Sequence, residues 1–196
     1  MKREHGHLEE WNKLHRLALA YLKEPHSIPE AEDLQRWRNP LRLWHYPSFE
    51  EHRTWSIYQQ TKPSDRLTRS LLRQVTWNRG FDAERLSLPM EGLKHGLHPQ
   101  PTIEVRDRPL DGDEFERRMA SLEGISVNLF AARTVGLDGE TFGVASANME
   151  AKWWCEGPDT WRELTAWASD MREWLCAIAD HEPDESRWEW PKPRLP

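Results

Sequence analysis

The sequence contains few cysteines, few apolar residues and no long apolar run. Cys155 and Cys176 are the only cysteines in 196 residues, too few for a disulfide framework and consistent with a reducing cytoplasm. The hydrophobic fraction is 37%, below the ~45–50% of an average globular domain. No run approaches the ~20 apolar residues of a membrane-spanning helix, and the polar N-terminus lacks the apolar core of a secretion signal. We therefore expect a cytoplasmic protein without a membrane segment.

Tryptophan, in contrast, is abundant. The chain has 12 of these residues: Trp11, Trp37, Trp44, Trp55, Trp77, Trp153, Trp154, Trp161, Trp167, Trp174, Trp188 and Trp190. One indole buries ~150–250 Å², so a few rings can build a core in a chain that is otherwise poor in apolar side chains. Partly exposed indoles also anchor protein interfaces. We predict a globular protein in which some indole rings remain partly exposed and bind a partner.

Charge is distributed unevenly along the chain. Residues 1–100 carry 16 Lys and Arg against 13 Asp and Glu, whereas residues 101–196 carry 11 against 20. An acidic surface attracts basic partners and accelerates their association. The sequence therefore favours a basic protein partner over nucleic acid.

We predict one domain over 1–196, with three parts. Residues 1–39 form a helical segment, because apolar residues recur at helical spacing over 8–24 until Pro25, and 29–38 has the features of a second, short helix. Residues 40–180 form an α+β body. Residues 181–196 form an extended tail that is rich in proline and tryptophan.

The body combines strands with two helices. Strands are predicted from aromatic and β-branched residues at 41–46, 54–59, 70–78, 102–106, 125–131, 141–146 and 149–155, although a helix beginning at Ser64 is an alternative to the third. Residues 79–101 are predicted as a loop, 113–122 as a helix, and 160–180 as a helix with a Thr160–Glu163 capping box. Leu137, Asp138 and Gly139 form a predicted hairpin turn. This order favours an α+β fold, with N-terminal helices and an antiparallel sheet of about five to six strands covered by helices on one face.

The main enzymatic alternative is a metal-dependent nuclease or phosphodiesterase. Asp138, Glu150 and Lys152 resemble the PD-(D/E)xK nuclease pattern, in which carboxylates bind Mg²⁺ and the lysine steadies the attacking water; Glu123 is a further candidate. A turn aspartate and an exposed charge pair explain the same residues more simply.

Four weaker patterns have similarly simple explanations. The four functions that these patterns suggest are zinc binding, hydrolysis by a catalytic triad, Mg²⁺ binding and nucleic-acid binding. They comprise, in that order, His95 with His98; His45 and His52 with Ser48, Glu50 and Glu51; Glu104, Asp107, Asp111, Asp113 and Glu114; and Arg66, Arg69, Arg73, Arg79 and Arg85 around Trp77.

Our leading hypothesis is a non-enzymatic bacterial binding or regulatory protein, such as an immunity-type inhibitor of a partner protein. We expect no cofactor and no bound metal, because the sequence contains no fingerprint for either. The predicted binding residues are Trp153, Trp154, Trp188 and Trp190. Adjacent Trp153 and Trp154 must face opposite sides of a strand, whereas Trp161 is predicted to be a core residue.

Overall fold

The computed structural model describes residues 2–29, 31, 33–61, 68–87, 100–128, 139–146 and 149–181. In these ranges the elements are α1 (Lys2–Lys23), η1 (Pro25–Ser27), β1 (Arg38–Pro47), β2 (His52–Thr61), β3 (Thr68–Trp77), α2 (Arg79–Ser87), β4 (Ile103–Leu110), α3 (Gly112–Glu123), β5 (Glu140–Ser146), β6 (Met149–Trp154), η3 (Asp159–Trp161) and α4 (Arg162–Asp180). The α+β class is confirmed.

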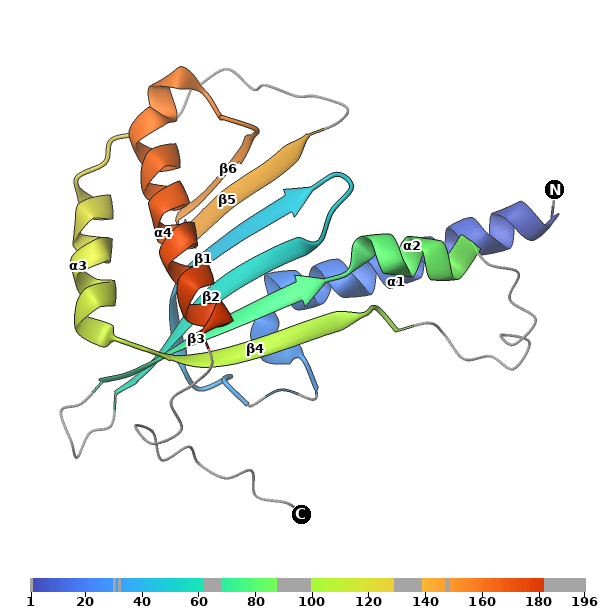
Figure 1. Cartoon of the computed structure of the whole chain (residues 1–196), viewed down its shortest axis with the longest axis horizontal. Coiled ribbons are helices and arrows are strands. Elements are labelled where there is room, and N and C mark those ends of the chain that lie inside the picture. The colour runs from blue at the N-terminus through green and yellow to red at the C-terminus, as the bar shows by residue number, and fades with distance from the viewer. Residues whose placement is uncertain are drawn as a thin grey trace, which may run out of the picture.

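The strands form one antiparallel sheet with the order β4-β3-β2-β1-β5-β6 (Figure 1). β1 to β4 run as a meander, and the β5–β6 hairpin extends the sheet from the free side of β1. The prediction of an antiparallel sheet with about five to six strands is therefore confirmed. Because successive side chains alternate between faces, each strand contributes to two separate layers of packing.

One layer lies under α3 and α4, on what we call the α4 face. Leu43, Trp55, Ile57 and Leu72 project from the sheet into it. The helix contributes its predicted stripe, buried at Leu164, Trp167, Ala168, Met171, Leu175 and Ala179. The spacing of three and four residues thus identified this helix correctly.

The opposite layer lies under α1, on what we call the α1 face (Figure 1). Leu14, Ala18 and Leu22 of α1 pack against Val75 and Trp77 of β3. The helices therefore cover both faces of the sheet, which corrects the expectation of a single covered face. Both sides of β3 are buried: Val75 and Trp77 pack under α1, and Leu72 packs under α4 on the other side.

The predicted helix over 29–38 is wrong. The described residues of this segment form turns, and β1 begins at Arg38. Leu34 and Trp37 nevertheless pack against Tyr58 and Leu71 of the sheet. Two apolar residues three positions apart suit a turn as well as a helix, so their spacing did not distinguish the two.

The segment predicted as a loop over 79–101 begins with a helix, α2. The Oδ1 atom of Asn78 accepts the backbone N–H of Phe81 at 3.0 Å, which is the bond of an N-cap residue. Gly80 and the polar residues around it concealed this helix. Residues 88–99 lie outside the described ranges.

Two further local predictions fail. Residues 125–128 are not a strand, although Ile125 and Val127 pack against the α4-face core; the rest of the predicted strand, and Leu137 with Asp138, lie outside the described residues. The Thr160–Glu163 capping box is absent, because η3 occupies 159–161 and Trp161 precedes α4 without a side-chain cap. At α3, by contrast, the Asp111 carboxylate accepts the N–H groups of Asp113 and Glu114 and caps the predicted helix.

Candidate functional site

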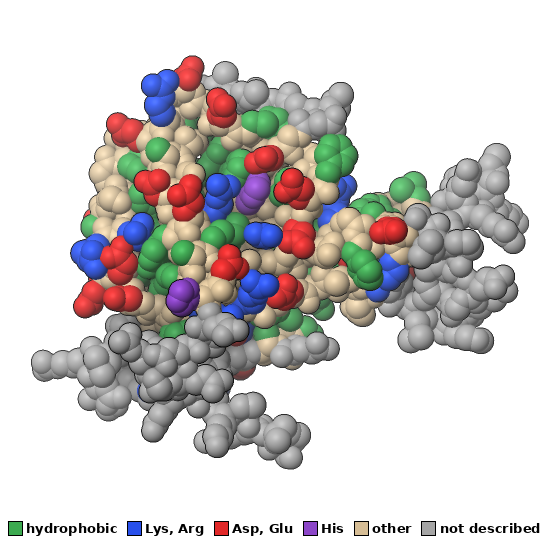
Figure 2. Space-filling view, in the orientation of Figure 1, with side chains coloured by type: hydrophobic (Ala, Val, Ile, Leu, Met, Phe, Trp, Pro, Cys, Tyr) green, Lys and Arg blue, Asp and Glu red, His purple; other side chains and the backbone are tan. Residues whose placement is uncertain are grey.

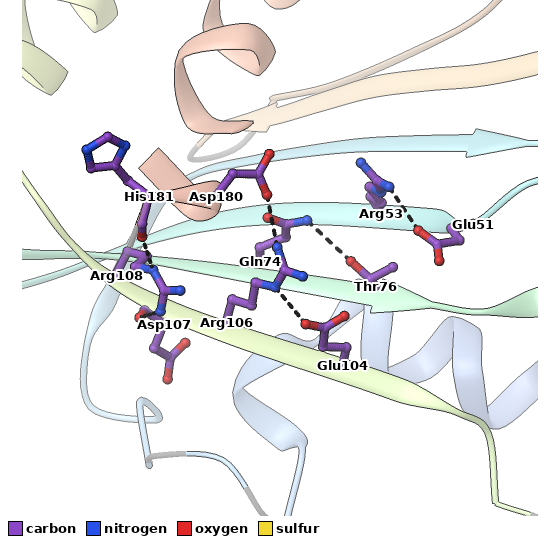
Figure 3. Close-up of polar contacts among 10 residues, drawn as sticks. All are labelled: Glu51, Arg53, Gln74, Thr76, Glu104, Arg106, Asp107, Arg108, Asp180 and His181. Carbon is purple, nitrogen blue, oxygen red and sulfur yellow. Dashed lines mark hydrogen bonds and ion pairs between the residues drawn. The ribbon is translucent and has the colours of Figure 1, made fainter. Parts of the chain in front are cut away.

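The C-terminal end of α4 is tied to β4. Nη1 of Arg106 lies 2.9 Å from Oδ1 of Asp180, and Nε of Arg108 donates to the carbonyl oxygen of His181 at 3.0 Å (Figure 3). Cationic side chains at this position satisfy the last carbonyl groups of a helix and oppose its dipole. These contacts join the end of α4 to β4, the edge strand of the sheet.

Towards the start of α4 the helix and the sheet enclose a pocket of about 310 Å³, which we call the aromatic pocket. Its strand wall is apolar and aromatic, and its helix wall is more polar. The residues that define it here are Leu43, Trp55, Phe142 and Trp153 on the strands and Thr165, Ser169 and Arg172 on α4.

A row of rings forms the floor beside this pocket. His45 stacks on Phe142 with centroids 4.3 Å apart and an interplanar angle of 3°, and Phe142 lies 6.2 Å from Trp153 at 16°. Trp161 meets Trp153 edge-on at 6.5 Å. The first three residues are direct cross-strand neighbours on β1, β5 and β6, so strand register creates the row.

A second, larger hollow of about 590 Å³ adjoins the aromatic pocket, and we call it the polar cleft. It is lined by His45, Phe49, Glu50, Glu51, Arg53, Trp55, Arg172, Glu173 and Cys176, among others. Trp55 and Arg172 line both hollows. Figure 2 shows acidic, basic and apolar side chains interspersed over this face of the molecule.

Two of the polar groups here are already partnered. Nη2 of Arg53 lies 2.9 Å from Oε2 of Glu51, and Nε2 of His45 lies 2.9 Å from Oε2 of Glu140. Burial lowers the pKa of His45, although the hydrogen bond to Glu140 opposes that shift. His45 is therefore predominantly neutral near pH 7.

A third hollow, of about 390 Å³, lies on the α1 face between α1 and the β1–β2 turn. His52 lines it and donates from Nε2 to the carbonyl oxygen of Pro47 at 3.0 Å. Its buried Nδ1 has no hydrogen-bond partner among the described residues. Burial lowers the pKa of His52 to about 4, which keeps the ring neutral.

The structure does not assemble the predicted hydrolase triad. The Ser48 hydroxyl donates to the carbonyl oxygen of Gly139 at 2.8 Å, while His45 bonds to Glu140 and His52 to Pro47. Neither histidine is thus engaged with the serine as its base.

The nuclease residues are placed only in part. Glu150 and Lys152 project from the same side of β6, and Glu150 lies 3.5 Å from Nη2 of Arg42. Asp138 lies outside the described residues, and Glu123 ends α3. Within the part of the chain that the structure describes, no three His, Cys, Asp or Glu side chains gather as a metal site. The nuclease hypothesis remains a prediction.

The acidic cluster around β4 is dispersed over separate structural roles. Glu104 pairs with Arg106, and Asp107 with Arg73. Asp111 caps α3, while Glu114 pairs with Arg117 and Arg118. These are the ion pairs and cap that a charged helix start requires. His95 and His98 lie outside the described ranges.

Most of the arginines considered for nucleic-acid binding serve the fold. Arg73 is fully buried and holds Asp107 through two hydrogen bonds of 2.6 and 2.7 Å. Arg79 donates to the Ser48 carbonyl oxygen, and Arg85 pairs with buried Asp82 at 2.9 Å. Arg69 is exposed, and Arg66 lies outside the described residues. The stretch therefore offers less free positive charge than its composition suggests.

The predicted binding tryptophans are divided. Trp153 is buried in the α4-face core and walls the aromatic pocket, whereas half-buried Trp154 lines the hollow on the α1 face. The two rings thus face opposite sides, as predicted. Trp188 and Trp190 lie outside the described residues. Trp161 is half-buried at the margin of the core rather than inside it, because it belongs to η3 and not to α4.

Sequence reasoning missed Phe142 and Arg172. Phe142 gains its role from neighbours on β1 and β6, and Arg172 lies on the flank of α4 beside the buried stripe. The helical spacing of Thr165, Ser169 and Arg172 was the available signal, but it carries meaning only once the position of the sheet is known.

Comparison with known proteins found no matching family model, curated protein or solved structure. Among the described helices, none has both the length and the apolar character needed to cross a bilayer.

Proposed function

We propose that the protein is a non-enzymatic binding or regulatory protein that receives a basic segment of a partner protein at the polar cleft. The observation that carries the proposal is Phe49. This side chain is 77% exposed at the β1–β2 turn, on the border of the cleft and directly before Glu50 and Glu51. An exposed ring beside a charged hollow is typical of an interface anchor.

A second exposed ring strengthens this surface. Phe81 of α2 is 51% exposed, and the start of α2 is held beside the β1–β2 turn by the hydrogen bond from Arg79 to the Ser48 carbonyl oxygen. Phe81 directly follows Gly80, which lines the polar cleft, so this second exposed ring belongs to the segment at the edge of the cleft.

The charges around the cleft favour a basic partner. Three acidic side chains (Glu50, Glu51 and Glu173) line it against two basic ones, Arg53 and Arg172, which leaves one net negative charge; Arg53 is paired with Glu51. Acidic groups of this kind steer a basic segment and raise its association rate. An immunity-type inhibitor that binds a basic bacterial toxin needs an acidic surface of this kind. Free Cys155 and Cys176 support a cytoplasmic location.

Affinity capture with the full chain tests the proposal. Wild type, Phe49→Ser and the control Leu8→Ser, which changes a side chain 61% exposed on α1, are used as baits in the native host. We expect one protein to be retained by wild type and Leu8→Ser and depleted by Phe49→Ser. Its purified form should bind more weakly as salt increases and when Glu50 and Glu51 are both changed to Gln.

Identical captured proteins for all three baits would contradict a site at Phe49. In the same experiment Trp154→Ala, Trp188→Ala and Trp190→Ala test the binding residues predicted from sequence. Loss of the partner with these variants, but not with Phe49→Ser, would move the interface to the α1 face or the tail.

A further inference from the structure

The aromatic pocket has one apolar wall and one wall that carries polar groups at regular spacing. Thr165, Ser169 and Arg172 occupy positions i, i+4 and i+7 of α4 and therefore lie along one side of the helix. Phe142 and Trp153 face them from the sheet. Pockets that bind small molecules combine apolar surface with a few positioned polar groups in this way.

Arg172 supplies a positive charge that contacts an aromatic ring rather than a carboxylate of the described residues. Its guanidinium carbon lies 5.5 Å from the centre of the Phe142 ring. No carboxylate among the described residues lies within 4.0 Å of it. Arg73, Arg106 and Arg118, in contrast, each hold a carboxylate. A half-buried guanidinium without a counter-ion gains more from an anion than an exposed one does.

Trp55 lies beside Arg172 where the two hollows meet. Its indole N–H is buried and has no acceptor among the described residues. Trp55 and Arg172 are the two side chains shared by the aromatic pocket and the polar cleft. Because the indole N–H of Trp55 is shielded from solvent, Arg172 is the donor that the junction offers to an anion.

The dimensions favour a small, flat ligand. The volume is about 310 Å³, at the lower end of ligand pockets. Phe142 and Trp153 lie within 16° of parallel. His45 already stacks on Phe142 at 4.3 Å, so a planar ligand ring packs against the parts of the two rings that line the pocket.

We propose that the aromatic pocket binds a small aromatic carboxylate. The ring packs on Phe142 and Trp153, and the carboxylate accepts hydrogen bonds from the Arg172 guanidinium at the pocket mouth. Ser169, one turn earlier on α4, is the neighbouring hydroxyl donor. This site adjoins the polar cleft and shares Arg172 with it. The partner proposal is tested at Phe49, which does not line the aromatic pocket, so either proposal can fail alone.

Isothermal titration calorimetry of the full chain with three probes of the same ring system tests the charge preference. The probes are 2-naphthoate, neutral 2-naphthamide and cationic 2-naphthylmethylammonium. We expect one molecule of 2-naphthoate per chain, bound at least about tenfold more tightly than the other two. Absence of 2-naphthoate binding at millimolar concentration, or equal or tighter binding of either other probe, would overturn the proposal; the cation would then point to Glu156 at the rim.

Variants locate the site. Arg172→Gln should weaken 2-naphthoate about tenfold or more and leave 2-naphthamide unchanged, and Arg172→Lys should fall between because a lysine lacks the planar fork. Arg162→Gln is the matched control, since Arg162 also borders the pocket but its side chain is 83% exposed. Ser169→Phe should fill the pocket and weaken both probes.

Circular dichroism establishes that each variant is folded before its affinity is compared. An Arg172→Gln variant that is folded and binds 2-naphthoate as wild type does, or an equal loss in Arg162→Gln, would remove Arg172 from the site and overturn the proposal.

Discussion

The two faces of the sheet use the same type of side chain to different effect. On the α1 face, Trp77 and Tyr58 are almost completely buried, and the indole N–H of Trp77 donates to Oδ2 of buried Asp82 at 2.8 Å. On the α4 face, Phe142 and Trp153 border an open pocket. An abundance of aromatic residues therefore does not by itself separate core from binding surface.

What covers each face explains the difference. α1 lies against β3 with Leu14, Ala18 and Leu22, and small and medium side chains let a helix approach closely. α4 is anchored at its C-terminal end by Arg106 and Arg108, while polar side chains lie along its flank nearer the start. The α1 face is thereby sealed over Trp77, and its hollow lies at the β1–β2 turn. The α4 face, in contrast, has two adjoining hollows beside its rings.

The largest effect should come from removing a sealed ring. Trp77→Ala deletes a fully buried indole and leaves Asp82 without that donor, so we expect a loss of ~3–5 kcal/mol in the free energy of unfolding. Trp161→Ala, at the margin of the α4 face, should cost only ~1–2 kcal/mol. Urea denaturation followed by circular dichroism measures both. An equal or larger cost for Trp161→Ala would show that the two faces do not differ in packing.

The ion pairs of β4 provide a second test across the same two faces. Asp107→Ala removes the carboxylate that accepts two hydrogen bonds from the fully buried Arg73 guanidinium on the α1 face, and we expect a loss of about 3 kcal/mol. Glu104→Ala breaks the exposed pair with Arg106 on the other side of the strand and should cost less than ~1 kcal/mol. Chemical denaturation of the two variants in parallel gives the contrast. Similar costs would mean that burial does not distinguish these pairs.

Local spacing predicted much of the fold. The stripe through Leu164, Met171 and Leu175 predicted the last helix, and the aromatic and β-branched run 54–59 lies within β2. Two of the failures, at 29–38 and at 125–128, have a shared physical cause. In 29–38 and in 125–128 a few apolar residues pack against the body without regular backbone structure, and their spacing alone did not reveal this.

The candidate site was less accessible to sequence reasoning. His45, Phe142 and Trp153 are distant in the chain and become neighbours only through the register of β1, β5 and β6. Arg172 differs from the other arginines because the carboxylates in the described residues that form ion pairs do so with other side chains. No local sequence pattern predicts that difference. Sequence reasoning did place Trp153 and Trp154 on opposite sides, since that follows from the alternation of a single strand.

Titration should also distinguish the faces. The pKa of His52 is lowered from 6.5 to about 4, so between these values the unfolded chain binds a proton that the folded chain does not. Stability should therefore decrease as pH falls from 6.5 towards 4, by about 3 kcal/mol in total. The physical reason is that protonation would place an N–H at the buried, unpartnered Nδ1.

Chemical denaturation at several pH values between 7.5 and 4.5 measures this dependence. His52→Gln should make the pH dependence visibly shallower than that of wild type. His45→Gln should change it less, because the hydrogen bond from His45 to Glu140 opposes the effect of burial on its pKa. Unchanged dependence in His52→Gln would show that the imidazole is not shielded as the structure indicates.

The smallest change in stability is expected at Gly143 of β5, which contacts Trp44. The indole of Trp44 lies so close to Gly143 that an added Cβ would overlap it and would also lie 2.8 Å from the Ala151 carbonyl oxygen. Gly143→Ala should therefore displace the ring and cost ~1–3 kcal/mol. Gly80→Ala is the matched control, because a Cβ there meets nothing within 4 Å and alanine favours the helix, so we expect a gain of ~0.5–1 kcal/mol. The same change thus has opposite signs at the two sites in urea denaturation, and stabilisation by Gly143→Ala would show that Trp44 does not rest on this strand.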